Sequence, residues 1–395
     1  MDLQFEKNKL YAHLGKDLVD LLKQNKAYVA GGTVTSLFCN REFKDVDIYF
    51  RDEESAINFL IDFWEEQKWI VSHTKKATLM LYDDVEIQMI HFNYFNTPED
   101  IFDTFDFTAC MGCFDFATEE FVLHSEFLKH NSQRIIKFNS NTAFPIVSLL
   151  RVQKYEEKGY KISKPEFIRI ILSCMNLDIT SYDELKEHLG GMYGINYDKL
   201  FEDVKDQEFD LEEAIGKIAN ITLSEEYFTK PDSVQFDKVE ELIDNISTKP
   251  IKCLYINEKL HKINYFGLLE DIRKLPENHI LLDTETFFNE NKFYKFVRKN
   301  DEGIYFSFYD KDFEYVIGEE AVANLNKKEY WGGDHAGKLH LNEKKAIDTS
   351  TYKNSEGAVL VELEVKVEDF IDADEGHIRV KKATVIREVP ESEYK

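Results

Sequence analysis

The chain has 395 residues, of which 43% are hydrophobic and 14% aromatic. This composition supplies material for several packed cores, so it excludes a disordered protein and predicts two or three domains. The 75 Asp and Glu residues outnumber the 49 Lys and Arg residues, and the net charge of −26 disfavours long-range attraction to nucleic acid or anionic membranes.

Cysteine usage and apolar runs indicate where the protein works. The five cysteines are scattered, which is typical of reduced thiols in the cytoplasm. Cys110 and Cys113 form a lone C-x-x-C, which we interpret as buried strand residues rather than zinc ligands. No apolar run approaches the roughly 20 residues that a membrane span needs. We therefore expect a cytoplasmic protein without membrane contacts.

The first part of the chain alternates between helical and strand patterns. We expect one helix from Phe5 to Gln24, then a short strand into a glycine turn, a short helix over TVTSLF and a strand over VDIYF. A helix over residues 53–67 follows. The segments ATLMLY and VEIQMIHF predict a hairpin, and FTACMGCFD predicts a buried strand.

The pattern then becomes helical from about Pro145 to Leu275, including NYFGLLEDIRKL, and strands dominate from His279 onward. In AVLVELEVKV, apolar and charged residues alternate, which predicts a strand with one exposed face. We interpret the glycine-rich segment WGGDHAGKLH, with His335 and His340, as a solvated loop. The predicted fold class is α+β, with a head over residues 1–140, a helical domain over 141–276 and a β-rich C-terminal domain over 277–395.

The most informative segment runs from Gly31 to Asp47. Gly31 and Gly32 precede a short helix, where free N–H groups would form a phosphate seat. Asp45 and Asp47 lie two apart on the next strand, so both carboxylates point to the same face. Such a seat opposite paired carboxylates is what two-metal nucleotidyl transfer requires.

A third carboxylate is expected from a neighbouring strand. In VEIQMIHF, Glu86, Gln88 and Ile90 share one face. Glu86 would bind the metal that activates the attacking hydroxyl, and could accept its proton. An exposed hairpin glutamate is the simpler interpretation when Glu86 is considered alone.

These motifs resemble the head of class II CCA-adding enzymes and bacterial poly(A) polymerases. GGTVTSLFCNREFKDVDIYF is similar to G-G-x-V-R-D-x-L-L-G-R-x-x-x-D-x-D without a gap, and VEIQMIHF, TFDFTACMGCFD and FPIVSLLRVQKY resemble later family segments in the same order. The resemblance covers about Ala27 to Tyr160. It implies a polymerase-beta-like nucleotidyltransferase head that uses NTP and two Mg²⁺ ions, with these residues at the nucleotide: Gly31, Gly32, Lys44, Asp106, Arg151 and Lys154.

The chain departs from the family where Thr35-Ser36 replaces Arg-Asp and Thr104-Phe105 replaces two arginines, and we find no base-selecting E-D-x-x-R motif. These changes leave the acceptor and the base open. Residues 123–170 carry nine Lys and Arg against four Glu, a stretch where triphosphate or an RNA end would lie. An ordinary solvated helix explains it equally well.

The sequence therefore predicts an NTP- and Mg²⁺-dependent transferase that moves a nucleoside monophosphate to an acceptor hydroxyl, in the first instance a tRNA-like RNA 3′ end. The alternative enzymatic function is the same transfer to a protein or small-molecule acceptor, as in toxin-like nucleotidyltransferases. A degenerate head that only binds is the non-enzymatic alternative. The C-terminal domain is expected to dock an acceptor or partner.

Overall fold

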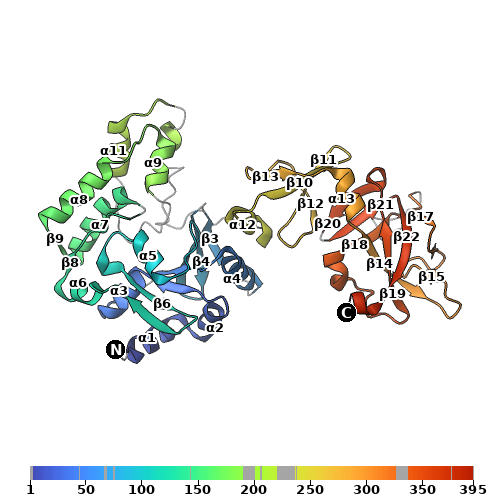
Figure 1. Cartoon of the computed structure of the whole chain (residues 1–395), viewed down its shortest axis with the longest axis horizontal. Coiled ribbons are helices and arrows are strands. Elements are labelled where there is room, and N and C mark those ends of the chain that lie inside the picture. The colour runs from blue at the N-terminus through green and yellow to red at the C-terminus, as the bar shows by residue number, and fades with distance from the viewer. Residues whose placement is uncertain are drawn as a thin grey trace. The chain divides into compact units, whose positions relative to one another are not determined.

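The computed structural model divides into two units, Met1–Ile246 and Ser247–Lys395 (Figure 1). Residues 141–246 of the expected helical domain fall in the same unit as the head, and residues 247–276 fall in the second unit. The structure describes residues 3–43, 45–65, 69–73, 76–142, 144–189, 201–204, 207–219, 236, 238–325, 337–374 and 376–394.

A mixed seven-stranded sheet forms the centre of the first unit, in the order β3-β4-β5-β2-β1-β6-β7. Only β2 and β5 pair in parallel, and the other neighbours in this sheet are antiparallel. Its strands are β1 Tyr28–Ala30, β2 Asp45–Tyr49, β3 Trp69–His73, β4 Ala77–Tyr82, β5 Val85–Ile90, β6 Gly112–Asp115 and β7 Glu120–Leu123. With the helices around it, this sheet confirms the predicted α+β class.

The helices before and between these strands largely follow the predicted pattern. The expected helix from Phe5 to Gln24 is, however, two helices, because Gly15 takes a φ of 77° that a continuing helix does not allow. The helices of this segment are α1 Gln4–Leu14, α2 Lys16–Gln24, α3 Gly32–Phe38, α4 Glu53–Glu65 and α5 Pro98–Thr104.

One face of the sheet is covered by α5 and its flanking loops. Tyr28 and Ala30 of β1, Tyr49 of β2 and Ile90 of β5 form a buried cluster there with Ile101 of α5. Residues two apart on a strand share a face. Asp45 and Asp47 therefore lie on the same face as Tyr49, at the other end of β2.

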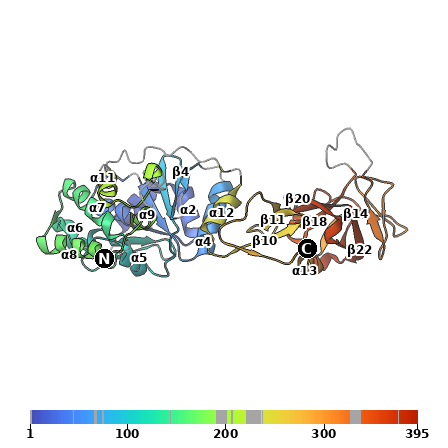
Figure 2. The same ribbon diagram turned by 90° about the horizontal axis from the view of Figure 1, so that it is seen from above.

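Apart from the short turn η1, which precedes β6, a helical layer follows the sheet in the chain (Figure 2). Its first core joins Phe107 to Val152, Tyr155 and Ile170, so it fixes the helix that carries two predicted site residues. The elements are η1 Thr108–Cys110, α6 Phe127–Gln133, β8 Ile135–Ile136, α7 Pro145–Glu157, β9 Lys161–Ile162, α8 Lys164–Met175, α9 Tyr182–Leu189, η2 Glu202–Val204, α11 Leu211–Ala219 and α12 Val239–Ile246.

The second unit begins with a four-stranded sheet in the order β12-β11-β10-β13. Its strands are β10 Ile251–Ile256, β11 Lys259–Ile263, β12 Leu269–Asp271 and β13 His279–Leu281, followed by α13 Thr284–Glu290. The segment NYFGLLEDIRKL was predicted to be a helix, and this prediction is wrong. Hydrogen bonds between Asn264 and Leu268 close a turn there, and β12 pairs with β11.

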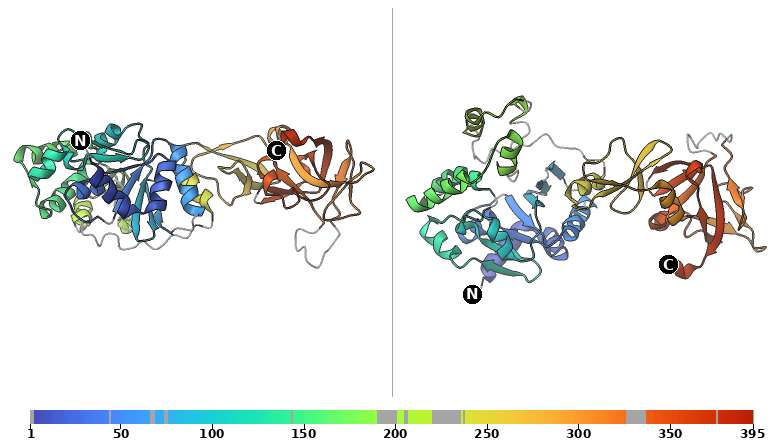
Figure 3. Two further views of the ribbon diagram at one scale, coloured as in Figure 1. Left: turned by 90° about the horizontal axis from the view of Figure 1, so that it is seen from below. Right: turned by 45° about the horizontal axis from the view of Figure 1, so that its top comes forward.

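A larger sheet completes the second unit, and Figure 3 shows its strands from two further directions. Seven strands run in the order β17-β22-β19-β14-β18-β21-β20, and β15 and β16 extend from β14. The strands are β14 Phe293–Lys299, β15 Tyr305–Phe306, β16 Glu314–Tyr315, β17 Glu320–Val322, β18 Leu339–Glu343, β19 Ala358–Glu364, β20 Phe370–Asp374, β21 His377–Val380 and β22 Lys382–Val389, with 3-10 turns η5 Lys344–Thr349, η6 Val367–Asp369 and η7 Glu391–Glu393.

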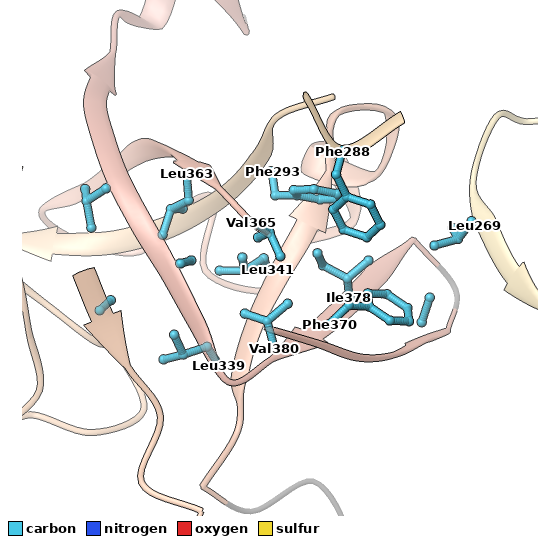
Figure 4. Close-up of a cluster of buried hydrophobic side chains, with 14 of the residues drawn as sticks. Leu269, Phe288, Phe293, Leu339, Leu341, Leu363, Val365, Phe370, Ile378 and Val380 are labelled. Atoms are coloured by element: carbon cyan, nitrogen blue, oxygen red, sulfur yellow. The ribbon is translucent and has the colours of Figure 1, made fainter. Parts of the chain in front are cut away.

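Both sheets of this unit contribute to one apolar core. Leu269 of β12, Phe288 of α13 and Phe293 of β14 pack with Leu341 and Ile378 (Figure 4). The core of residues 247–395 is therefore separate from the cores of the head.

Three strand predictions need correction. FTACMGCFD is a strand only from Gly112, because Thr108–Cys110 forms a 3-10 turn. AVLVELEVKV ends as a strand at Glu364, and Glu362, which was expected on the exposed face, is buried and accepts a hydrogen bond from Arg387 Nη2 at 2.9 Å. HIRVKKATVIREV is two strands, β21 and β22. Among the residues described, no helix is both long and apolar enough to cross a membrane.

Candidate functional site

The turn between β1 and α3 places Gly31 against the sheet. Gly31 has a φ of 78°, which favours glycine, and an added Cβ would lie 3.4 Å from Phe105 Cζ and 3.7 Å from Asp47 Oδ2. Its N–H donates to the Gly112 carbonyl at 3.1 Å. The predicted phosphate seat therefore does not include the Gly31 N–H, and would use N–H groups at the start of α3, beginning with Gly32.

Threonine side chains hold this turn in place. Thr33 Oγ1 donates to the Asp45 carbonyl at 2.9 Å, which ties the first turn of α3 to the start of β2. Thr35 Oγ1 lies 2.9 Å from the carbonyl oxygens of both Gly31 and Ala109. Thr35 stands where the resembling family has arginine, so a buried structural hydroxyl replaces a ligand-binding cation.

The two aspartates of β2 share one face, as the sequence predicts. The burial pattern of β2 alternates, with Val46 and Ile48 buried and Asp45 and Asp47 partly exposed. Burial and then the negative charge of Asp45 raise the pKa of Asp47 to about 7, while the positive charges of Arg151 and Lys154 act in the opposite direction. Asp47 thus lies where the carboxylates of β2 and the cations of α7 meet.

Glu86 lies beside Asp45 in the sheet. In the parallel register of β2 and β5, Asp45 is opposite Glu86 and Asp47 is opposite Gln88, so these four side chains emerge on one face. Within the described ranges, however, no group of three or more His, Cys, Asp or Glu side chains is arranged to hold a metal ion. The carboxylates are aligned, but a closed three-carboxylate metal site is not formed.

Asp106 and Arg151, both predicted to contact nucleotide, bind each other. Arg151 Nη1 lies 3.0 Å from Asp106 Oδ1, and the two side chains are 18% and 3% exposed. Burial raises the pKa of Asp106, and the guanidinium of Arg151 opposes this shift. The buried carboxylate therefore fixes Arg151 and does not itself face the solvent.

The guanidinium of Arg151 has further neighbours on η1 and α7. Its Nη2 donates to Cys110 Sγ at 3.6 Å, and its centre lies 5.7 Å from the Tyr155 ring centroid and 5.9 Å from that of Phe107. Cys110 Sγ is 2.6 Å from the Tyr155 hydroxyl. Cys110 and Cys113 are both free, buried thiols. Their burial was predicted, but only Cys113 lies on a strand, because Cys110 ends η1.

The basic stretch over residues 123–170 is partly neutralised. Lys129 pairs with Glu126, and Lys137 and Arg169 pair with Glu166. Cations also gather at α7, because Lys154, Arg151 and Arg41 all help to lower the pKa of Lys158, after the larger effect of burial. The positive surface is thus local to α7 and the segment before β2. Lys44, predicted to bind nucleotide, lies outside the described residues.

Sequence reasoning missed the part played by Phe105. It replaces a family arginine, yet its ring packs 3.4 Å from where a Gly31 Cβ would lie and contributes to the clusters on both sides of η1. An apolar aromatic residue at a position where the family motif has a cation was the feature of the sequence that indicated packing.

Comparisons with known proteins place this chain in a family. The profile of the family described as "Gabija anti-defense 2 family protein" matches residues 4–134. A protein of Bacillus phage SPbetaL7, "Gabija anti-defense 2", is 55% identical over 395 residues, which is 100% of this chain and 98% of the relative. The chain belongs to the Gabija anti-defense 2 family.

Solved CCA-adding enzymes are among the structural neighbours of this anti-defense family member. The Bacillus stearothermophilus enzyme in complex with CTP is 17% identical with a TM-score of 0.34, and the match covers 45% of this chain and 47% of that enzyme. The Thermotoga maritima enzyme in complex with tRNA is 15% identical with a TM-score of 0.34, over 60% of this chain and 65% of that enzyme. The chain therefore spans about half the length of the first of these enzymes.

Proposed function

We propose that the chain transfers a nucleoside monophosphate from an NTP to an acceptor hydroxyl, and that this reaction serves the anti-defense role for which its relative is named. The observation that supports this best is the register of β2 and β5, which aligns Glu86 with Asp45 on the face that also carries Asp47. Arg151 and Lys154 act electrostatically on that same face. Carboxylates that could bind a metal ion and cations that could bind phosphate thus act on the same face of the sheet, as binding of a metal-bound triphosphate would require.

The donor chemistry of this site fits magnesium. Mg²⁺ prefers oxygen ligands, is commonly bound by one or two carboxylates together with substrate phosphates, and keeps several waters. Asp45 and Asp47 would hold it, and Glu86 would complete the set of carboxylates. When bound, magnesium would stabilise negative charge on the transferring phosphate. Arg151 and Lys154 would orient the triphosphate, and Glu86 would accept the proton of the acceptor hydroxyl.

We propose an RNA 3′ end as the acceptor, because the cations at α7 adjoin the carboxylate face. Arg134 lies 5.2 Å and Arg41 lies 6.0 Å from the ring centroid of the buried Tyr160, so these two cations gather beside the end of α7. A cationic surface is one feature of single-strand binding sites. The net charge of −26 acts against RNA at long range, so the acceptor needs its own experiment.

The test incubates the purified chain with Mg²⁺, each α-labelled NTP in turn, and either total RNA or a ribonuclease-treated host lysate. Label that ribonuclease removes would support RNA. Label that resists nuclease but is lost on protease treatment would show a protein acceptor and correct the RNA assignment. If no acceptor gains label and no pyrophosphate is released with any NTP, nucleotidyl transfer itself is wrong.

Asp47→Asn provides the matched variant for this experiment. The change is nearly isosteric and removes one carboxylate charge, so transfer should fall by at least about a hundredfold while the fold is kept. Glu120→Gln, an exposed acid on β7, is the control and should keep full activity. Equal activity in the two variants would contradict the assignment of Asp47.

A further inference from the structure

The second unit contains a pocket of about 430 Å³ that the proposed transfer reaction does not use. It lies where β14 and β18 separate. These strands pair at only two positions, Phe293 with Glu343 and Tyr294 with Asn342, and beyond them the gap is lined by residues of both strands, of β21 and of the segment that carries β15 and β16. Pockets of roughly 300–1,000 Å³ are typical of small-molecule sites.

A lysine from the core side of β14 lines this pocket. Lys295 lies between Phe293 and Val297, which are 1% and 0% exposed and belong to the apolar core, and alternate residues of a strand share a face. Lys295 itself is half-buried. Its Nζ donates to the main-chain carbonyl of His340 at 2.8 Å, a carbonyl at the point where the two strands have separated.

The charge of Lys295 is not neutralised by the described part of the chain, where no carboxylate forms an ion pair with its amine. Burial lowers the pKa of Lys295 to about 8, so the amine is still mostly protonated at neutral pH. Asp310 also lines the pocket, but it acts on Tyr315, whose pKa is raised by burial first and by Asp310 second. Among the described residues, the amine of Lys295 therefore has no ion-pair partner, and the pocket also contains the carboxylate of Asp310.

A second polar side chain also lines the pocket. Asn342 of β18 is 5% exposed and lines the pocket. Its side-chain amide forms no hydrogen bond with the residues that the structure describes. Asn342 and Lys295 thus supply an amide and a cation, both available to a molecule in the gap.

Aromatic rings also line the pocket. Phe313 and Tyr315 lie 5.0 Å apart between ring centroids at an angle of 61°, and Tyr352, which also lines the pocket, stacks on Phe308 at 5.0 Å and 4°. Flat rings beside a cation and a free amide suit a flat ligand with an acidic group. Residues 337–340, which the sequence suggested were part of a solvated loop, instead line this pocket, and Leu339 begins β18.

We propose that this pocket binds a small planar aromatic anion, with its phosphate or carboxylate at Lys295 and a polar ring edge at Asn342. Nucleoside monophosphates and aromatic carboxylates share this chemistry. The site lies within the second unit, so it does not depend on the reaction proposed for the head.

Calorimetry on the full chain tests this site. The chain carries Asp47→Asn, so that nucleotide binding by the head is weakened, and the probes are AMP, GMP, CMP, UMP and indole-3-carboxylate. At least one probe should bind at one site, and Lys295→Met should weaken that binding at least tenfold. Arg298→Met, which removes an exposed cation from the same strand, should leave affinity unchanged. If only the nucleotides bind, the acidic group of the natural ligand is a phosphate. If only indole-3-carboxylate binds, it is a carboxylate.

Reductive labelling provides a test that needs no variant. Pyridoxal 5′-phosphate condenses with a lysine amine, loses water to form an imine, and borohydride reduces the imine to a stable secondary amine. Mass spectrometry should find Lys295 labelled, and the bound probe should protect Lys295 but not the exposed Lys366. The proposal is overturned if no probe binds saturably at millimolar concentration, if Lys295→Met binds as tightly as the parent, or if the probe gives no protection.

Discussion

Asp106 and Arg151 form an ion pair with 3.0 Å between Oδ1 and Nη1, although 44 residues separate them in the chain. The pair joins the segment before η1 to α7. It directs the guanidinium of Arg151 toward the face that carries Asp47, where its positive charge opposes the rise in the pKa of Asp47. Asp106 therefore works as the residue that positions Arg151.

The first prediction concerns the stability of this pair. Asp106→Asn should lower the free energy of unfolding by about 3 kcal/mol, because it leaves a largely buried guanidinium without its carboxylate. Adding Arg151→Met should restore part of that loss, since the double variant no longer carries an unpaired charge. Urea unfolding of the two single variants and the double variant measures the coupling. Lys129→Gln, which breaks an exposed pair, should cost under about 1 kcal/mol. Strictly additive effects of the two core substitutions would contradict the pairing.

The second prediction concerns pH. Burial raises the pKa of Asp47 from 3.8 to about 7 in the folded chain. Between these two values the unfolded chain releases this proton while the folded chain keeps it, so the stability contributed by this residue falls as pH rises from about 4 to about 7. In buffer with EDTA, Asp47→Asn should therefore stabilise the chain more at pH 8 than at pH 5, by about 2 kcal/mol for a partly exposed group.

Chemical denaturation at the two pH values measures this difference. Glu120→Gln controls for a general loss of negative charge and should shift stability equally at both. If the advantage of Asp47→Asn does not change between pH 5 and pH 8, Asp47 does not titrate in this range.

The third prediction separates two adjacent glycines. Gly31→Ala should cost about 1 kcal/mol or more, because alanine is strained at a φ of 78°. Gly32→Ala should be neutral or slightly stabilising, because Gly32 lies in α3 and nothing lies within 4 Å of an added Cβ. Thermal unfolding compares them. Equal melting temperatures would contradict the described turn.

The fourth prediction concerns the division of the chain. A chain that ends at Ile246 should fold cooperatively and bind Mg·NTP as tightly as the full chain, because the carboxylates and α7 all lie in this unit. It should lose selectivity for its acceptor if residues 247–395 dock that acceptor. Circular dichroism establishes folding, and calorimetry measures nucleotide affinity. A folded fragment that no longer binds nucleotide would mean that the second unit contributes to the site.

The sequence could predict the carboxylate face because a strand repeats every two residues. Asp45 and Asp47 had to share a face once the strand was assigned, and the face of Glu86 followed from the alternation with Val85 and Ile87. That Glu86 lies opposite Asp45 depends on the parallel pairing of two strands, which no local pattern specifies.

Long-range pairing explains most of what could not be predicted. Asp106 and Arg151 each matched a ligand-binding position, and nothing in either segment indicates that they bind each other. The segment 264–275 has helical spacing of apolar residues, but Leu269 is buried by strand pairing with β11 and by the core of the second unit. Local periodicity was overridden there by tertiary contacts.

The pairing of β2 with β5 also limits the positions at which residues can be inserted into this chain without disturbing the carboxylate face. One residue inserted between Val85 and Glu86 would turn Glu86 to the opposite face of the sheet, away from Asp45. An insertion in the connection between β2 and α4 would change the spacing along the chain without changing the register. Relatives should therefore differ in the number of residues between the two carboxylate strands, while the position of each acid within its own strand stays fixed.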